Sequence, residues 1–298
     1  MNRRDWLIGS AAITGSALTV RLQGRKYARD LRPKHSRIAI LHADQYSDKL
    51  DELIYDGLRL FKLNVVGKSV LLKPNFVEYV PGKPVNTDAQ LIGAAAEAFL
   101  RLDAASVTVG EGPGHHRDTD LLLYETGLAD QLAPRKVAFV DLNRDELIKT
   151  KLQANYSGVG HLWFPRSVLA AGFIVSMPKV KTHHWTGVTL SMKNMFGIVP
   201  GSRYGWPKNV LHWAGIHESV LDICATVRPH FVIADGVVGM EGDGPLNGTA
   251  KELHTILLSD DPVAADSTLA RLLGWEPNAV KHIQEAGWFI GNHRGVVL

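Results

Sequence analysis

Residues 177–203 mix cationic and apolar side chains along their whole length. The segment contains Lys179, Lys181, Lys193, two adjacent histidines and Arg203, and methionine, valine, leucine, phenylalanine and isoleucine separate them. A surface helix would sort polar and apolar residues onto two faces, so this pattern places cations in apolar surroundings. Because burying an unpaired charge is costly, such cations need a partner. The segment therefore predicts a binding site for a small anionic ligand.

Polar residues outside this segment are expected to complete the same site. Lys73 follows a predicted strand, and Pro74 fixes the exit of that strand, which aims the lysine side chain consistently. Lysine offers an anion a point charge, and arginine offers a two-pronged donor. The candidate ligand-binding residues are Lys73, Asn75, Glu111, Lys179, Thr182, Lys193, Asn194 and Arg203. Lys208, by contrast, is interpreted as an ordinary solvated lysine.

Three residues are candidates for acting on a bound substrate, and these candidate catalytic residues are His183, Glu241 and Lys181. Histidine can move protons near neutral pH, and a carboxylate can accept them. Glu241 lies in a glycine-dense loop, residues 239–245, whose backbone can approach a ligand closely. The alternative interpretation of this loop is a tight turn without a ligand.

A divalent metal ion is a second hypothesis for the histidines and carboxylates. His183, Asp235 and Glu241 could hold one together, because imidazole and carboxylate groups are common metal ligands. His183 and His184 are expected to point in opposite directions along an extended segment, so they cannot easily bind one ion as a pair. The sequence has no His-Glu-x-x-His motif. Two further histidines are interpreted as surface residues, His282 and His293.

The composition is that of a soluble globular protein with a mild positive charge. Of the 298 residues, 45% are hydrophobic and 21% are charged, and the formal net charge is +3. So small an excess argues against nucleic-acid binding, which needs a basic stripe on one face. The only cysteine, Cys224, excludes disulfides within the chain and an intrinsic iron–sulfur cluster. It lies in a predicted amphipathic helix, residues 216–227, where a buried inert thiol is favoured over a nucleophile.

Residues 1–24 resemble a twin-arginine export signal. Arg3 and Arg4 precede a charge-free, moderately hydrophobic run from Leu7 to Val20. This run is shorter than the roughly 20 residues that a membrane-spanning helix needs. The sequence therefore predicts export by the twin-arginine machinery, with the protein either periplasmic or anchored to the membrane by an uncleaved signal. The alternative is a frayed helix with a chance pair of arginines.

Short apolar runs alternate with helical periods from residue 36 onward. Strands are predicted at residues 37–41, 69–72, 106–110, 137–140, 173–177, 231–235 and 255–258, and helices at 47–63, 88–102, 119–127, 216–227, 263–273 and 277–286. This alternation favours an α/β fold with a mostly parallel sheet and helices on both faces, in a single domain over residues 35–298. Because ligands bind beyond the carboxyl ends of parallel strands, chemistry is expected where these runs end. The residues at those ends are Lys73, Gly110, Asp141, Pro178, Asp235 and Asp260.

Several of these motifs occur together in one known family. In chain order they are Lys73-Pro74-Asn75, Pro178-Lys179-Val180-Lys181-Thr182-His183, Lys193-Asn194-Met195-Phe196-Gly197, Pro200-Gly201, the segment from Asp235 to Pro245, and Asp261-Pro262-Val263-Ala264-Ala265-Asp266. Over roughly residues 35–290 the chain resembles the domain-of-unknown-function 362 family, whose members are often exported or fused to ferredoxin-type cluster domains. This chain lacks their cysteine clusters. The resemblance therefore implies a separate redox or ferredoxin-type partner for any cluster-based electron transfer, and it implies no reaction.

Two functions from different classes remain open on the sequence. The first is an exported enzyme that acts on a small anionic substrate, which predicts a closed pocket where lysines and carboxylates approach one another. The second is a non-catalytic accessory protein that binds a metal, a cofactor or a partner in an exported iron–sulfur or redox system. That function predicts a flatter patch, or histidines clustered at metal-ligand distances. Apart from the possible divalent metal, the sequence identifies no cofactor.

Overall fold

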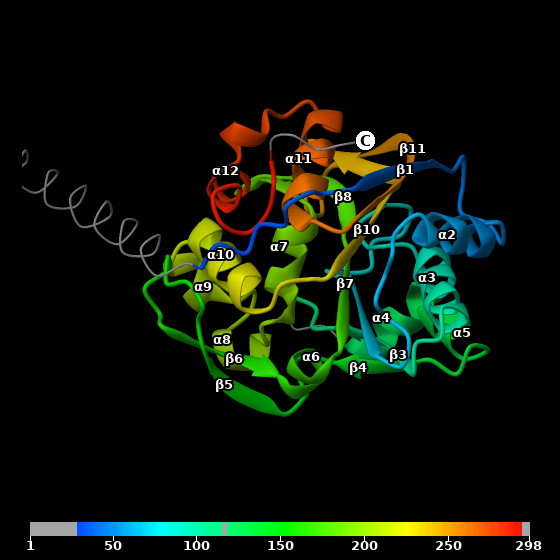
Figure 1. The fold of residues 1–298 in the computed structure, drawn as a ribbon, viewed down its shortest axis with the longest axis horizontal. Helices are drawn as coiled ribbons and strands as arrows, with labels where there is room; N and C mark the ends of the chain where they lie inside the picture. Colours follow the sequence, from blue (N-terminus) through cyan, green and yellow to red (C-terminus); the bar gives the residue numbers. More distant parts are fainter. Residues whose placement is uncertain (1–28, 115–117, 294–298) are drawn as a thin grey trace, which may run out of the picture.

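A nine-stranded sheet runs through the centre of the molecule, within residues 29–114 and 118–293, which the computed structural model describes (Figure 1). In spatial order its main path is β1 (Ile38–His42), β11 (Thr249–Ser259), β10 (Phe231–Glu241), β7 (Phe173–Met177), β2 (Ser69–Pro74), β3 (Ser106–Glu111) and β4 (Ala138–Asp141). β8 (Lys179–His183) pairs with β10 and with β9 (Gly187–Thr189). A separate two-stranded sheet is formed by β5 (Leu147–Lys151) and β6 (His161–Pro165).

The strands from β10 through β7, β2 and β3 to β4 are parallel to one another. After β2 the chain moves outward to β3 and β4, and it then returns to the opposite side of β2 as β7. The strand order therefore reverses between β2 and β7. In open parallel sheets this reversal leaves a crevice beyond the carboxyl ends of the strands, where ligands bind.

Helices cover both faces of the sheet, because alternate strand residues point to opposite sides. Val70 and Leu72 of β2 belong to one apolar core, with α2 (Leu50–Arg59), α3 (Ala89–Arg101) and α5 (Leu128–Leu132). Leu71 belongs to the other core, with α7 (Ser191–Met195), α10 (Ile216–Thr226), α11 (Pro262–Leu272) and α12 (Lys281–Ala286). Figure 1 shows these two groups of helices on opposite sides of the strands. The predicted α/β fold with a mostly parallel, doubly covered sheet is confirmed.

The remaining helical elements are short and connect these layers. They are α4 (Thr119–Glu125), α6 (Arg166–Ala170), α8 (Gly201–Tyr204), α9 (Asn209–Trp213) and two 3-10 turns, Phe196–Ile198 and Pro277–Ala279. No helix in the described part of the chain is long and apolar enough to cross a membrane. The predicted signal, residues 1–24, lies outside the described residues.

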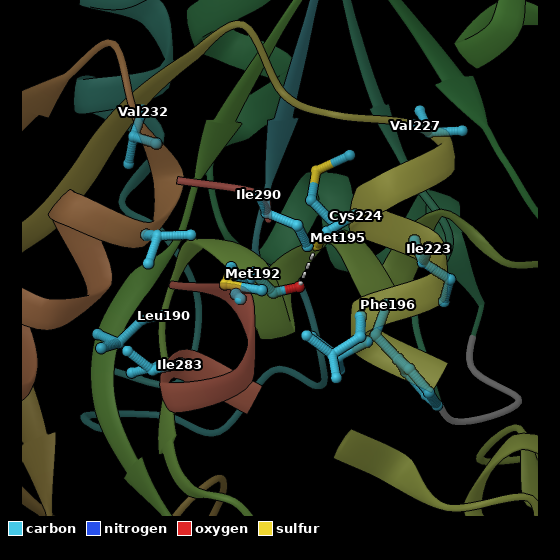
Figure 2. Packing of buried hydrophobic residues seen from close by; sticks show 14 of the residues in the cluster. Leu190, Met192, Met195, Phe196, Ile223, Cys224, Val227, Val232, Ile283 and Ile290 are labelled. Atoms are coloured by element: carbon cyan, nitrogen blue, oxygen red, sulfur yellow. Dashed lines mark hydrogen bonds between the residues drawn. The ribbon is translucent and has the colours of Figure 1, made fainter. Parts of the chain in front are cut away.

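Cys224 lies deep in the core formed by α7, α10 and α12. Figure 2 shows it among Met192, Ile223 and other apolar side chains, with its thiol directed at a backbone oxygen. Its Sγ donates to the Met192 carbonyl at 3.4 Å, and burial raises the pKa of the thiol well above its ordinary value. A raised pKa suppresses the reactive thiolate. The predicted burial of Cys224 is therefore confirmed.

The structure corrects two expectations about polar residues. β11 is antiparallel to β10, so Asp260 follows its strand at the edge opposite the other predicted strand ends, where it accepts from Arg37. The two histidines interpreted as surface residues, His282 and His293, are 0% and 7% exposed. His282 is buried because α12 packs against α10, which places its Nδ1 3.0 Å from His217 Nδ1.

Candidate functional site

A cavity of about 210 Å³ lies at the carboxyl ends of β2 and β3. β8, α7 and the segments around residues 207–212 and 243–247 provide its remaining walls. This position is the crevice that the reversal of strand order at β2 creates. Of the residues predicted from the sequence, the cavity brings together Lys73, Asn75, Glu111, Lys181, His183, Lys193 and Asn194.

A buried ion pair forms the floor of the cavity. Lys73 Nζ donates to Glu111 Oε2 at 2.5 Å, to Asn194 Oδ1 at 2.9 Å and to the Pro74 carbonyl at 2.8 Å. All three ammonium hydrogens are therefore used, and Lys73 is 0% exposed. Burial lowers the pKa of Lys73, and the Glu111 carboxylate opposes that shift. Lys73 supplies a fixed positive charge rather than a free donor.

Glu111 is held as firmly as its partner. Beyond Lys73, its Oε2 accepts from the Phe76 backbone N–H at 3.0 Å, and its Oε1 accepts from that of Gly112 at 2.8 Å. Gly197 packs directly over the pair, because a Cβ there would lie 2.5 Å from Lys73 Nζ and 2.9 Å from Glu111 Oε1. Both carboxylate oxygens of Glu111 thus face donors within the protein.

Lys181 projects from β8 into the cavity and is 0% exposed. Its Nζ donates to the Val85 carbonyl at 2.7 Å, and this is its only hydrogen bond within the described residues. Burial, and then the nearby charges of Lys179 and Lys193, lower the pKa of Lys181 well below its ordinary value. A neutral amine is the form that such surroundings favour.

Lys193 and Lys208 add two further cations. Lys193 extends from α7, with its Nζ 4.6 Å from the centre of the Phe196 ring, and no carboxylate pairs with it within the described residues. Burial lowers its pKa to about 8. Lys208 is 2% exposed and donates to the Gly112 and Gly197 carbonyls, each at 3.2 Å. Burial lowers the pKa of Lys208 to about 7.

The interpretation of Lys208 as a solvated lysine is therefore wrong. Lys208 precedes α9 with a φ of 69°, and this left-handed turn directs the chain back over the cavity. Local sequence gives no sign of this, because the surrounding residues show no regular apolar spacing. His212, one turn further along, also lines the cavity and was likewise not predicted.

His183 at the cavity is held in its neutral form. The Trp185 backbone N–H donates to His183 Nδ1 at 3.0 Å, and burial lowers the pKa of His183 to about 2. A neutral ring that accepts at Nδ1 carries its proton on Nε2. His184 lies beyond the end of β8, and its ring stacks on that of His183 at 4.9 Å. The expected opposite orientation of the two rings is therefore wrong, because the chain turns at this point.

Two buried polar atoms at the cavity have no hydrogen-bond partner within the described residues. They are Asn75 Oδ1 and Thr189 Oγ1. Buried polar groups nearly always find a partner in proteins or in ordered water. Both atoms belong to residues that line the cavity, so a ligand or solvent there would satisfy them.

The other predicted site residues lie apart from this cavity. Thr182 Oγ1 donates to the Gly242 carbonyl at 2.8 Å, and Glu241 is exposed, with Oε2 2.5 Å from Lys251 Nζ. Arg203 is exposed and stacks over the Trp163 ring at 4.7 Å. The predicted positions are thus divided between the cavity and its surroundings.

The three residues of the metal hypothesis are separated in the structure. Asp235 is buried in contact with Lys179, and Glu241 pairs with Lys251 at the far end of β10, while His183 lines the cavity. In residues 29–114 and 118–293, no three histidine, cysteine or carboxylate side chains come close enough together to hold a metal ion.

Lys179 and Asp235 form a second buried ion pair. Lys179 Nζ donates to Asp235 Oδ2 at 3.0 Å and to the Tyr46 hydroxyl at 2.7 Å. Tyr46 donates in turn to Asp235 Oδ1 at 2.7 Å, and the Asp88 backbone N–H donates to Oδ2 at 2.9 Å. Burial and the nearby Asp235 raise the pKa of Asp88 to about 6. This network ties β8 and β10 to the start of α3.

One protein family and a protein of Synechocystis sp. match much of the chain. The family described as "Domain of unknown function (DUF362)" matches residues 70–271. Over 220 residues the chain is 23% identical to the thylakoid-associated protein sll1697 of Synechocystis sp.; the match covers 72% of this chain and 65% of that protein, so the chain spans just under two thirds of this relative.

Two solved structures resemble the chain at the level of fold only. A protein of Thermotoga maritima is 13% identical with a TM-score of 0.47, and the match covers 84% of this chain and 61% of that one. The lactate racemase apoprotein of Thermoanaerobacterium thermosaccharolyticum is 14% identical with a TM-score of 0.44, over 74% of this chain and 54% of that one.

Proposed function

The chain belongs to the family of the domain of unknown function DUF362, a description that names no reaction, and from the geometry of its cavity we propose that it binds a small anionic ligand there. One observation carries this proposal. Four lysines, Lys73, Lys181, Lys193 and Lys208, line the cavity, and Glu111 is the only buried carboxylate among its described lining residues. Glu111 pairs with Lys73, and Lys181 favours its neutral form, so the excess positive charge belongs to Lys193 and Lys208. A bound anion would balance this charge.

The size and polarity of the cavity support a small ligand. Its volume of about 210 Å³ lies below the range of roughly 300–1,000 Å³ that holds drug-sized molecules. Lys193 is the member of the set best placed to meet an anion, because its ammonium faces the Phe196 ring and has no hydrogen bond or ion pair within the described residues. Asn75 and Thr189 add polar atoms without partners.

Replacing Lys193 with methionine is expected to weaken anion binding about tenfold or more, since removing one contacting charge typically costs at least about 1.4 kcal/mol. Titration calorimetry of the full chain with inorganic phosphate and with pyruvate measures the affinity. The matched control is Lys62→Met, which removes an equal charge from an exposed position outside the cavity. Equal affinities of Lys193→Met and Lys62→Met would contradict the proposal.

The same titration has an expected pH dependence. Lys193 and Lys208 bind an anion in their protonated forms, and burial lowers their pKa values to about 8 and about 7. The affinity for pyruvate, whose charge is constant over this range, should therefore fall as the pH rises through these values. Binding should in turn raise both pKa values, so protons are taken up when the anion binds. An affinity that is flat between about pH 6 and pH 10 would contradict this charge assignment.

We also propose that the protein is exported by the twin-arginine machinery, on the strength of Arg3, Arg4 and the apolar run that follows. The cyanobacterial relative is described as thylakoid-associated, and an uncleaved signal would give this chain a membrane location as well. Replacing both arginines with lysine is expected to leave the protein inside the cell, as measured by fractionation and immunoblotting. Unchanged export of that variant would contradict the proposal.

The alternative is a non-catalytic accessory protein that binds a metal or cofactor beside a separate ferredoxin-type partner. Its proposed ligands were His183, Asp235 and Glu241. The geometry supports this alternative less, because both carboxylates of the set, Asp235 and Glu241, are paired with lysines. Stoichiometric metal in the purified protein would favour this alternative.

A further inference from the structure

Lys181 differs from the other lysines of the cavity in its hydrogen bonding. An ammonium group carries three hydrogens and needs three acceptors when it is buried. Lys181 is 0% exposed, yet the Val85 carbonyl is its single acceptor among the described residues. A neutral amine has only two hydrogens, so at this position it leaves one donor without an acceptor instead of two, and it buries no charge.

The other lysines have surroundings that suit a charged group better. Lys73 has three acceptors, one of them a carboxylate. Lys193 faces the ring of Phe196, an arrangement that attracts a cation. Lys208 has two backbone carbonyls. Lys181 is therefore the amine in this cavity whose surroundings best suit a free lone pair, and the nearby positive charges of Lys179 and Lys193 reinforce that state.

A neutral buried lysine beside other cations is the arrangement that makes the amine a nucleophile toward carbonyl carbon. The surrounding cations, in turn, suit a carboxylate. From these two features we propose that Lys181 forms a Schiff base with a small oxo acid, a carboxylate that also carries a ketone or aldehyde group. This inference rests on the proposed function, because it requires that the cavity bind an anion.

The reaction balances within the cavity. The Lys181 lone pair attacks the carbonyl carbon, a C–N bond forms, and one amine proton passes to the carbonyl oxygen to give a carbinolamine. Its hydroxyl group then takes a proton from the ammonium of Lys193 and leaves as water, which leaves a protonated imine on Lys181. The charge lost by Lys193 is thus regained on the imine nitrogen. Hydrolysis reverses these steps and returns the oxo acid.

Trapping with borohydride tests the proposal. The full chain is incubated with pyruvate and sodium borohydride at neutral pH, and the reduced adduct is located by peptide mass spectrometry. An ordinary exposed lysine is neutral in only about one molecule in a thousand at pH 7, so the adduct should be concentrated at Lys181. Lys181→Met should lose it, whereas Lys62→Met should retain it. Excess inorganic phosphate, which competes for the cations but cannot form an imine, should suppress it.

The outcomes separate this inference from the function on which it rests. Phosphate and pyruvate binding without an adduct on Lys181 would overturn the Schiff base and leave anion binding intact. Absence of both binding and adduct would overturn the proposed function as well. An adduct spread evenly over exposed lysines would also overturn the Schiff base. If Lys181→Met fails to fold, as judged by its unfolding transition, the test relies on the protein without substitutions. An adduct located at Lys181 in that protein supports the Schiff base, and an adduct located elsewhere overturns it.

Discussion

Replacing Glu111 with glutamine is expected to lower the free energy of unfolding by about 3–5 kcal/mol, the usual cost of leaving one member of a buried ion pair alone. Glu111 accepts hydrogen bonds from Lys73 Nζ, the Phe76 N–H and the Gly112 N–H. Glutamine keeps the shape but turns one oxygen into a donor, so an N–H group would face another donor. Lys73 would also lose its counter-charge at a site that is 0% exposed. Chemical denaturation followed by circular dichroism at pH 7 measures the loss.

Two comparisons make the Glu111 result specific. Glu52→Gln is the matched control, because Glu52 pairs with Arg101 at the surface and exposed pairs contribute little. Lys73→Met combined with Glu111→Gln should be destabilised by less than the sum of the two single variants, since neither charge is then left alone. Strict additivity of the two substitutions would show that the ion pair does not couple these residues.

Replacing Lys179 with methionine should produce a loss of similar size, again about 3–5 kcal/mol. Asp235 is 0% exposed and would keep the Tyr46 hydroxyl and the Asp88 N–H, but it would lose its only cation among the described residues. Because this network holds β8 against β10, the same change should also weaken anion binding in the cavity, which Lys181 lines further along β8. Denaturation and calorimetry on one preparation measure both effects.

Tyr46→Phe provides a graded comparison for Lys179. It removes the hydroxyl that bridges Lys179 and Asp235 but leaves both charges in place. The expected loss is about 1.5–3 kcal/mol, as for a hydrogen bond to a charged group. A loss for Tyr46→Phe that equals or exceeds the loss for Lys179→Met would argue that the hydroxyl, rather than the ion pair, maintains the network.

The sheet and its covering helices could be predicted because their signals are local. Apolar runs such as residues 173–177 and 231–235 mark buried strands by themselves, and the strand ends then place Lys73 and Pro178 at one edge. β8 and β9 were not predicted, because Lys179 and Lys181 within β8 break the apolar pattern. Those lysines are buried only because partners distant in the sequence surround them.

The cavity was predicted only in part, because some of its residues are brought together by contacts between distant parts of the chain. Residue types pointed to Lys181, Lys193 and Asn194, and the structure places these three residues around one cavity. The same residue types also pointed to Arg203, which has similar mixed neighbours in the sequence. In the structure Arg203 lies over the Trp163 ring at the surface, outside the cavity. Lys208 was missed because a backbone turn, rather than a pattern of side chains, directs it inward. Tertiary contacts decide such cases, and single-sequence patterns do not contain them.

The cavity draws its lining residues from segments between Lys73 and Asn247, so no short piece of the chain contains it. During synthesis Lys73 and Glu111 leave the ribosome first, and the cations of β8 and α7 and Lys208 follow much later. The pocket can therefore be completed only after more than two thirds of the chain has emerged. If the proposed twin-arginine export holds, the protein folds before it is exported, and the first anion to enter the proposed site would be one present in the compartment of synthesis. The ligand bound to freshly exported protein would then be an anion from the cytoplasm and not one from the compartment to which the protein is exported.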